Sequence, residues 1–394
     1  MGVVVPLMPE IDFGYDEVPD LHELIEQLRA HGPVVRVKYL GEPVWAILDH
    51  AELNQAFHDL EHFDQAEGYK IIAEPSMGHN LQTMSGEEHR INRAMVNGMF
   101  LPRNARSYVE ALIEPVAHEI LDRIEGQREV EFVQAFARPY PFTVITRLLN
   151  IPVSDEGKLL KWAISLIDFP WDPEGALAAR AAFDRYIQPL IDERRHNPTG
   201  DFISGLVTAE FEGHRLDDGQ IMTFCRLLFP AGSDTAYKNG GSLFACVLAD
   251  DEIRAQAKRG DQDRAAIVTE GLRWQAPVAM NPRMASADVK LGDANIKKGD
   301  WVLFAITAAN SDPKVFANPR KFDPSRDNST LISFGRGAHF CLGMHLARRE
   351  LEIALKVVLE RFPNIRLKPG SKVEFTHAVL RGPRELWVQP FGKA

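Results

Sequence analysis

Apolar residues recur every three or four positions through most of the middle of the chain, which is the spacing of amphipathic helices. The pattern predicts helices over residues 87–99, 108–124, 142–149, 156–167, 176–195 and 218–249. A last strong helix is expected over residues 342–361. At 1.5 Å per residue, the helix over residues 218–249 would be roughly 48 Å long, enough to cross a domain. Pro230 lies inside it and should help to kink it.

Short strand-like runs flank this helical part on both sides. They occur at residues 34–37, 44–48, 287–292, 301–306 and 385–389. Residues 68–84 contain Gly, Pro and Met and are expected to form a loop, and residues 312–342 are rich in Gly and Pro. Strands and helices do not alternate as in a doubly wound sheet. The pattern therefore predicts a mainly α fold with small β-sheets (α+β), and no repeat or long linker divides it.

Composition narrows the classes of function. The 394 residues are 45% hydrophobic and carry a formal net charge of −10, which argues against nucleic-acid binding. Three cysteines without metal-type pairing indicate a reducing compartment. The apolar stretch over residues 3–8 is far below the ~20 residues that span a bilayer, and no cationic segment precedes it. We therefore expect a cytoplasmic protein that does not bind membranes.

The segment from Phe334 to Gly343 (FGRGAHFCLG) surrounds Cys341. Its two glycines before the cysteine permit a tight turn. The helix that follows would present unpaired N–H groups and its positive dipole end to the sulfur, which favours a thiolate. Phe334 and Phe340 would exclude water from it. Taken alone, however, a cysteine in a glycine-rich loop is more often an inert structural residue.

The whole segment resembles the haem-binding loop of the cytochrome P-450 family, F-x-x-G-x-(R/H)-x-C-x-G, at every fixed place. The resemblance implies that Cys341 is the axial ligand of the iron of haem b. It also implies that His339 contacts a haem propionate. A thiolate ligand pushes electron density onto the iron and favours cleavage of the O–O bond.

A second motif, Ala231-Gly232-Ser233-Asp234-Thr235, lies in the middle of the long helix. Gly232 would allow a flat ligand to approach closely, and Asp234 with Thr235 supplies an acid beside an alcohol, a plausible proton relay. The same residues could equally bend or cap a helix. In the cytochrome P-450 family, the matching segment A-G-x-(D/E)-T lies over the distal face of the haem and relays protons. Ala236 replaces the second threonine of many members, and we do not expect this to abolish the relay.

Two further sets of residues follow in the order that the resemblance requires. Glu270 and Arg273 can pair on one helix face, and Arg326 would complete the family's structural triad behind the cysteine loop. His89 and Arg93 are one turn apart, and they match family contacts to the haem propionates, as does Arg283. Without the resemblance, each of these sets would be read as ordinary surface charges.

The family position of several apolar segments implies the substrate contacts. These are residues 68–84, residues 277–280 and 378–380, and in particular Leu227, Leu228, Val278, Ala279 and Val379. Phe169 and Trp171 would lie in a mobile lid. The apolar character implies a hydrophobic small-molecule substrate, although core packing explains any one of these residues equally well.

The resemblance covers nearly the whole chain and implies a single domain over residues 1–394, with the haem between the long helix and the cysteine loop. It implies a monomeric monooxygenase that inserts one atom of O2 into its substrate. No flavin or dinucleotide domain is visible, so electrons would come from a separate ferredoxin and its NAD(P)H-dependent reductase. Arg90, Arg103, Arg348 and Arg349 could dock such a partner, or could be ordinary solvated charges.

Two other functions stay open at this point. One is a peroxygenase driven by hydrogen peroxide, against which the Asp234-Thr235 pair argues, because peroxide-using relatives tend to lack it. The other is a non-catalytic haem-binding protein, which would have no need of a proton relay.

Overall fold

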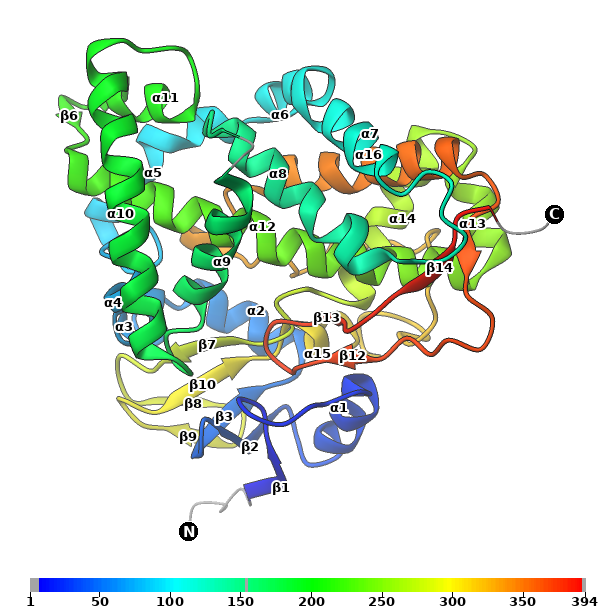
Figure 1. The fold of residues 1–394 in the computed structure, drawn as a ribbon. Coiled ribbons are helices and arrows are strands. Elements are labelled where there is room, and N and C mark those ends of the chain that lie inside the picture. Colours follow the sequence, from blue (N-terminus) through cyan, green and yellow to red (C-terminus); the bar gives the residue numbers. More distant parts are fainter. Residues whose placement is uncertain (1–6, 153–154, 392–394) are drawn as a thin grey trace.

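The computed structural model describes residues 7–152 and 155–391. The long helix α12 (Asp218–Ala249) runs through the middle of the helical part, and a small sheet lies to one side of it (Figure 1). Asp217 and Gln220 fix its start: the Asp217 carboxylate accepts from the Gln220 backbone N–H at 2.7 Å, and Gln220 Oε1 accepts from the Asp217 N–H at 3.0 Å. The helix has the predicted bounds and continues through Pro230.

The other helices largely follow the apolar periodicity of the sequence, and α8, α9, α10, α14 and α16 pack directly against α12. Their bounds are α1 (Leu21–Arg29), α2 (His50–His58), α3 (Gln65–Ile72), α4 (Glu74–Met77), α5 (Gly86–Asn97), α6 (Pro102–Tyr108), α7 (Glu114–Asp122), α8 (Pro139–Leu148), α9 (Glu156–Ile167), α10 (Pro173–His196), α11 (Phe202–Thr208), α13 (Asp251–Ala257), α14 (Asp261–Trp274), α15 (Ile306–Asn310) and α16 (Met344–Arg361). Among these described helices, none is long and apolar enough to cross a membrane.

The main sheet joins strands from the two ends of the chain in the order β1-β2-β3-β10-β7. Its strands are β1 (Leu7–Asp12), β2 (Val34–Tyr39), β3 (Glu42–Ile47), β7 (Asn281–Met284) and β10 (Trp301–Phe304). β2 and β3 form a hairpin, β10 pairs parallel to β3, and β7 pairs antiparallel to β10. β7 is therefore fixed as an edge strand, from which Arg283 reaches the candidate site.

Smaller sheets complete the described chain. β4 (Val130–Glu131) pairs with β14 (Trp387–Gln389), which also pairs with β11 (Arg366–Leu367). Three short hairpins are β5–β6 (Glu210–Phe211 and His214–Arg215), β8–β9 (Val289–Leu291 and Ala294–Ile296) and β12–β13 (Phe375–Thr376 and Gly382–Pro383). The expectation of a mainly α fold with small sheets is therefore confirmed.

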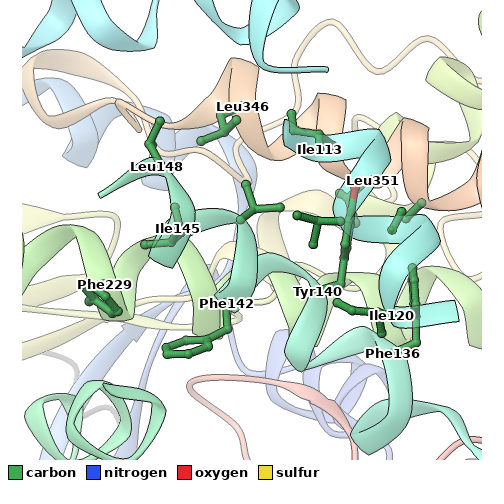
Figure 2. Packing of buried hydrophobic residues seen from close by; sticks show 14 of the residues in the cluster. Ile113, Ile120, Phe136, Tyr140, Phe142, Ile145, Leu148, Phe229, Leu346 and Leu351 are labelled. Atoms are coloured by element: carbon green, nitrogen blue, oxygen red, sulfur yellow. The ribbon is translucent and has the colours of Figure 1, made fainter. Parts of the chain in front are cut away.

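The largest hydrophobic cluster fills the space between α8, α12 and α16, and Figure 2 shows its central side chains. Phe142 of α8 and Phe229 of α12 lie with ring centroids 5.8 Å apart. Leu346 and Leu351 of α16 belong to the same cluster. Burial of each such side chain stabilises the fold by about 1.5–3 kcal/mol. The helix that follows Cys341 is thus anchored in the core.

The expected loop over residues 68–84 is wrong in its first half, because α3 and α4 occupy residues 65–77. Asp64 caps α3 by accepting the Ala66 backbone N–H at 2.9 Å. A Cβ on buried Gly68 would lie only 3.0 Å from the Trp301 ring and 3.2 Å from the Met284 backbone nitrogen. Close packing against the sheet stabilises this helix, and the local sequence pattern does not reveal such packing.

Two other predicted elements are divided in the structure. The helix over residues 108–124 contains a π-helical turn (Val109–Ile113) before α7, next to Pro115, which has no N–H to donate. The strand over residues 301–306 ends at Phe304, and α15 follows. Of the apolar stretch over residues 3–8, residues 3–6 lie outside the described residues, and Leu7 and Met8 begin β1.

Candidate active site around Cys341

Two glycines shape the turn before Cys341. Gly335 and Gly337 have φ angles of 71° and 70°, in the left-handed region that glycine occupies without strain. A Cβ on Gly337 would lie 2.7 Å from the Phe57 carbonyl oxygen, so no larger residue fits there. The Cys341 N–H donates to the Phe334 carbonyl at 2.9 Å and closes the loop. The backbone therefore forms the tight turn that the sequence predicts.

The Cys341 sulfur lies at the N-terminus of α16. The residue is exposed on one side but otherwise enclosed by protein, and burial raises the pKa of its thiol. The Gly343 and Met344 N–H groups and the positive charge of Arg93 act in the opposite direction and favour the thiolate. The helix N-terminus thus presents its N–H groups to the sulfur, as the sequence predicts.

Four basic side chains meet beside this loop. His89 and Arg93 come from α5, Arg283 from β7 and His339 from the loop itself, and the rings of His89 and His339 have centroids 4.2 Å apart. Burial and the charges of His89, Arg283 and Arg93 lower the pKa of His339 to about 3. Within the described residues, none of the four forms an ion pair with a carboxylate.

The hydrogen bonds of this basic cluster leave donors free. Arg93 Nη2 donates to the Phe340 carbonyl at 2.5 Å, and Arg283 Nη2 donates to Gln65 Oε1 at 2.7 Å. His89 Nε2 is buried and has no hydrogen-bond partner among the described residues. Arg93 and Arg283 carry positive charge without a carboxylate partner among the described residues, and Arg283 is buried, so a bound anion would stabilise this cluster. A ligand with two carboxylates, such as haem b with its two propionates, fits these residues.

The accessible face of α12 contains Ala231, which is exposed although it lies in the middle of a long packed helix. Leu227, Leu228 and Thr235 share this face at helical spacing and are half-buried. Thr235 Oγ1 donates to the Ala231 carbonyl at 2.8 Å. These residues thus form one partly accessible face of α12, and their contact with haem or substrate stays a prediction.

Gly232 packs closely against α8. A Cβ at this position would lie 2.7 Å from Cδ1 of Ile145, which belongs to α8. The glycine is therefore needed for the close packing of α12 on α8, away from the face of Ala231. The approach of a flat ligand to Gly232, which is half-buried, stays a prediction.

Asp234 projects toward α9, on a different side of α12 from Thr235. It is 8% exposed, and its Oδ2 accepts a hydrogen bond from Lys238 Nζ at 2.6 Å. It lines a small cavity whose other walls are Arg138, Leu160, Ala163, Ile164, Ile167, Pro230, Ser233 and Tyr237. The acid and the alcohol are neighbours in the chain and are not joined by a hydrogen bond. Sequence reasoning missed Lys238, although its i+4 spacing from Asp234 favours a pair.

Glu270, Arg273 and Arg326 come together as expected. Glu270 and Arg273 of α14 are both fully buried, with the nearest nitrogen and oxygen atoms 2.7 Å apart. Arg326 Nε lies 3.4 Å from Glu270 Oε1 and joins α14 to the segment before the cysteine loop. Asn328 also donates to Glu270, at 3.1 Å, and the sequence did not identify it. The triad thus holds the loop from behind and does not touch the accessible space.

The two segments expected to contact substrate are joined to each other. The Ala279 N–H donates to the Val379 carbonyl at 2.8 Å, and Val278 pairs with Leu380 in an isolated bridge. Ala279 and Val379 are buried, whereas Val278 is half-buried. Arg381, which sequence reasoning missed, is 1% exposed and donates to the backbone carbonyls of residues 18, 19 and 377. It fixes this pair of segments to the start of α1.

The expected lid residues Phe169 and Trp171 lie between α9 and α10. Phe169 is half-buried, and Trp171 is exposed but donates from Nε1 to the Gly14 carbonyl at 2.9 Å. This connection therefore contacts the N-terminal segment.

The four arginines considered for partner docking differ in their contacts. Arg90 pairs with two carboxylates, Glu87 and Glu212, each at 2.6 Å, which neutralises its charge. Arg349 pairs with Glu352, and Arg348 stacks on the Phe334 ring. Arg103 on α6 is exposed, and no ion pair is found for it within the described residues. Arg90 is therefore a poor candidate.

Comparison with known proteins identifies the family. The sequence model of the family named Cytochrome P-450 matches residues 13–154 and 265–386, which is more than half of the chain. The chain belongs to the cytochrome P-450 family. It is an oxidoreductase of the monooxygenase class, and the cofactor of the family is haem b.

This cytochrome P-450 is similar to many bacterial members. The biotin biosynthesis cytochrome P-450 of Bacillus subtilis is 30% identical over 388 residues, covering 94% of this chain and 95% of the relative. The structure of the bacillaene polyketide synthase cytochrome P-450 PksS from Bacillus subtilis has a TM-score of 0.87 and 30% identity, and covers 94% and 96%. The structure of P-450 BioI in complex with a hexadecenoic acid-ligated acyl carrier protein has a TM-score of 0.84 and 28% identity, and covers 93% and 97%.

Proposed function

We propose that this cytochrome P-450 hydroxylates or epoxidises a hydrophobic small molecule, with Cys341 as the axial ligand of its haem. The observation that carries the proposal is the placement of the Cys341 sulfur at the N-terminus of α16, beside an unpaired basic cluster. Bound there, haem b supplies the activation of O2, from which one oxygen atom enters the substrate and the other leaves as water.

The residues that would hold the cofactor have different roles. The Gly343 and Met344 N–H groups stabilise the negative charge on the Cys341 sulfur. His89, Arg93, Arg283 and His339 would bind the two propionates. The arginines supply positive charge and the histidines supply N–H donors, and none of the four pairs with a carboxylate among the described residues. In our proposal Phe334, whose ring packs under Arg348, would limit the access of water to the loop once haem is bound. The remaining residues act on the opposite side.

On the α12 side, we assign Thr235 and Asp234 to proton delivery. The Thr235 hydroxyl lies on the accessible face beside Ala231, and the Asp234 carboxylate borders the small cavity toward α9. In our proposal Asp234 takes up a proton on the cavity side and Thr235 presents one to the accessible face. Because no hydrogen bond joins the two side chains, a bridging water would carry the proton between them. This arrangement favours the O2-dependent reaction over a peroxide-driven one, which needs no proton relay.

The substrate contacts follow from accessibility. Leu227, Leu228 and Val278 are partly exposed toward the site and would contact a hydrophobic substrate. Ala279 and Val379 are buried, so they act by pairing their backbones and shaping the wall. Side chains of this kind select by shape and apolar area.

Electrons reach this protein from separate redox partners, in our proposal a ferredoxin and its NAD(P)H-dependent reductase. α6 packs on α16, so exposed Arg103 lies on the same side of the molecule as the helix that follows Cys341. A cationic residue at this place suits an acidic partner protein.

The experiment that tests the proposal compares two oxidant systems. The haem-loaded protein is first screened for compounds that shift its ferric Soret band. Each compound that does is then incubated either with ferredoxin, reductase and NAD(P)H or with hydrogen peroxide alone. The proposal predicts oxygenated product chiefly in the first system. Product formation in peroxide alone, with none in the reconstituted system, would contradict it.

A further inference from the structure

A polar groove of about 320 Å³ lies on the surface over α4. α4 packs against both α3 and α10 (Figure 1), and side chains from all three helices line the groove. The lining residues are Lys70, Glu74, Pro75, Gly78, His79 and Arg180. None of them belongs to the basic cluster beside Cys341, so the groove is a second place where polar groups from distant parts of the chain meet.

Arg180 of α10 is half-buried and has no carboxylate partner among the described residues. Its Nη1 donates to the Pro75 carbonyl at 2.6 Å, and no other hydrogen bond of its side chain is found in the described part of the chain. This bond fixes the guanidinium at the groove, and the remaining N–H groups stay free for a ligand. A guanidinium fixed in this way is suited to bind an oxyanion bidentately.

Glu74, the carboxylate in the lining, is occupied by His79. Its Oε2 lies 3.3 Å from His79 Nδ1, and Glu88 lies 2.9 Å from the other ring nitrogen. Burial lowers the pKa of His79, but the hydrogen bonds to Glu88 and Glu74 outweigh burial and raise this pKa. The negative charge of Glu74 is thus shared with a histidine and does not neutralise Arg180.

Lys70 of α3 supplies a second cation to the groove. It pairs loosely with Glu67, at 3.5 Å, and both side chains are nearly half exposed. An exposed pair of this kind contributes little to stability, so Lys70 can turn toward a ligand. The groove therefore offers an anion two cations, one from each of the helices that pack against α4.

One wall of the groove lies against α12. A Cβ on Gly78 would lie 2.8 Å from Cγ2 of Thr223, so the backbone of Gly78 packs directly on this helix. Leu227 and Ala231 follow Thr223 at intervals of four residues and share its face of α12. At 1.5 Å per residue, Ala231 is about 12 Å along the helix from Thr223. The groove therefore lies at one end of the partly accessible face on which we place the substrate contacts.

We propose that this groove binds the anionic head group of the substrate, a carboxylate that Arg180 binds and Lys70 attracts. The apolar body of the substrate extends from there along α12, past Leu227 to Ala231. The inference rests on the proposed function, because it narrows the hydrophobic substrate to an apolar acid. The carbon that is oxidised lies about 12 Å or more from the head group, since this is the length of α12 between the groove and Ala231.

The first experiment compares straight-chain fatty acids of increasing length with their methyl esters, which have the same chain without the charge. Binding to the haem-loaded protein is measured by the shift of the ferric Soret band at neutral pH. At the best chain length, the acid should bind about tenfold more tightly than its ester, or about 1.4 kcal/mol. Added salt should reduce this preference, because it screens a partly exposed ion pair. A series in which no acid binds better than its ester would overturn the proposal.

Variants of the two cations locate the preference. Arg180→Gln should weaken binding of the acid about tenfold and leave binding of the ester unchanged, whereas Arg180→Lys, which keeps the charge, should retain most of the preference. Lys70→Gln should reduce the preference about twofold, the effect of an exposed charge. The matched control is Arg185→Gln, which removes an exposed arginine of the same helix outside the groove and should change neither affinity.

A purely structural role of Arg180 gives a different result. Loss of its hydrogen bond to the Pro75 carbonyl would loosen α4 and weaken binding of the acid and the ester alike. Equal weakening of both ligands by Arg180→Gln would therefore overturn the proposal.

Inorganic phosphate distinguishes the head group of a substrate from a free anion. Its binding to the parent protein and to Arg180→Gln is measured by the line width of its phosphorus NMR signal. Phosphate should bind far more weakly than the best acid, because it lacks the apolar body. Arg180-dependent binding of phosphate, together with equal binding of acids and esters, would show that the groove takes a free anion and would overturn the proposal.

These binding measurements involve no turnover, so they separate failure of this inference from failure of the proposed function. An Arg180-dependent preference for acids, without oxygenated product from the reconstituted system, would contradict the proposed function alone. Oxygenated product without such a preference would overturn only the assignment of the groove.

Discussion

The cysteine loop and the middle of α12 are held in place by different interactions. Backbone geometry fixes the loop: glycines with positive φ, the hydrogen bond from Cys341 to Phe334, and a fully buried Glu270–Arg273 pair behind it. Around Asp234, side chains decide the arrangement, through an ion pair with Lys238 and a small cavity toward α9. Main-chain contacts and a buried triad thus fix the first region, whereas the second depends on contacts between side chains.

The difference has a functional reason. A metal ligand must keep one position through every turnover, so main-chain contacts and a buried triad suit it. A proton relay must change its protonation state and its hydrogen bonds, so weaker and partly exposed pairs suit it. Variants in the two regions should therefore differ in their defects. Those in the cysteine loop should lose stability and haem, and those in the middle of α12 should lose product formation to hydrogen peroxide.

The largest loss of stability is expected for Glu270→Gln, in the buried triad behind the cysteine loop. The change leaves Arg273 and Arg326 buried without their carboxylate, which costs about 3–5 kcal/mol. Urea unfolding and haem content measure the loss. The control is Glu87→Gln, which removes an exposed pair with Arg90 and should change stability little. A loss of unfolding free energy below about 1 kcal/mol for Glu270→Gln would show that the triad does not stabilise the cysteine loop.

Thr235→Ala should lower the fraction of electrons that ends in product and should leave the stability of the fold unchanged. We expect normal haem content and an unfolding midpoint close to that of the parent protein. Product formation should fall about 10²-fold, or about 2.7 kcal/mol in the barrier, with electrons diverted to hydrogen peroxide. Thr235→Ser, which keeps the hydroxyl, should retain most of the activity. Fully coupled product formation by the alanine variant would remove Thr235 from the relay.

Gly337→Ala should destabilise the loop by about 2 kcal/mol, because it combines strain at positive φ with a contact of 2.7 Å to the Phe57 carbonyl. Chemical unfolding and the rate of haem loss report the effect. Gly98 has φ −53° and no neighbour within 4 Å of an added Cβ, so Gly98→Ala serves as the control. Equal stability of the two variants would contradict the idea that backbone geometry fixes this loop.

The smallest effect is a pH dependence of stability at His22, whose Nε2 donates to the Trp274 carbonyl at the end of α14. Burial lowers the pKa of His22 to about 4, below its unfolded value of about 6.5. The folded state thus prefers neutral His22, and its stabilisation is complete above about pH 6.5 and lost as the pH falls toward 4. The unfolding free energies of the parent and His22→Gln should converge on acidification from pH 7 to about 5. A difference in unfolding free energy that does not change with pH would show that His22 does not cause a pH dependence of stability.

How much the sequence revealed differs between the same two regions. The fixed positions of the cysteine loop each have a backbone reason, so Gly335, Gly337 and Cys341 could be interpreted without a structure. The spacing of Glu270 and Arg273 and the later Arg326 were equally informative. Asn328, which adds a hydrogen bond to the buried carboxylate, comes from an irregular segment without periodicity and gave no signal.

Around α12 the sequence identified residue types and not their directions. Gly232 packs on Ile145 because α8 crosses there, and only tertiary structure reveals such a crossing. Helices α3 and α4 replace an expected loop because Gly68 fits against the sheet, and the local composition suggests the opposite. Arg90 is a poor docking residue for an acidic partner because Glu212, far away in the chain, neutralises its charge. The sequence alone does not reveal this pair.

The central claim is that the Cys341 sulfur ligates the haem iron, and one spectrum tests it most directly. The dithionite-reduced, CO-bound protein should absorb at the wavelength diagnostic of a thiolate ligand. Cys341→His should lose that band, and Cys246→Ser, at a half-buried position in the last turn of α12, should keep it. A spectrum of Cys341→His identical to that of the parent protein would contradict the assignment.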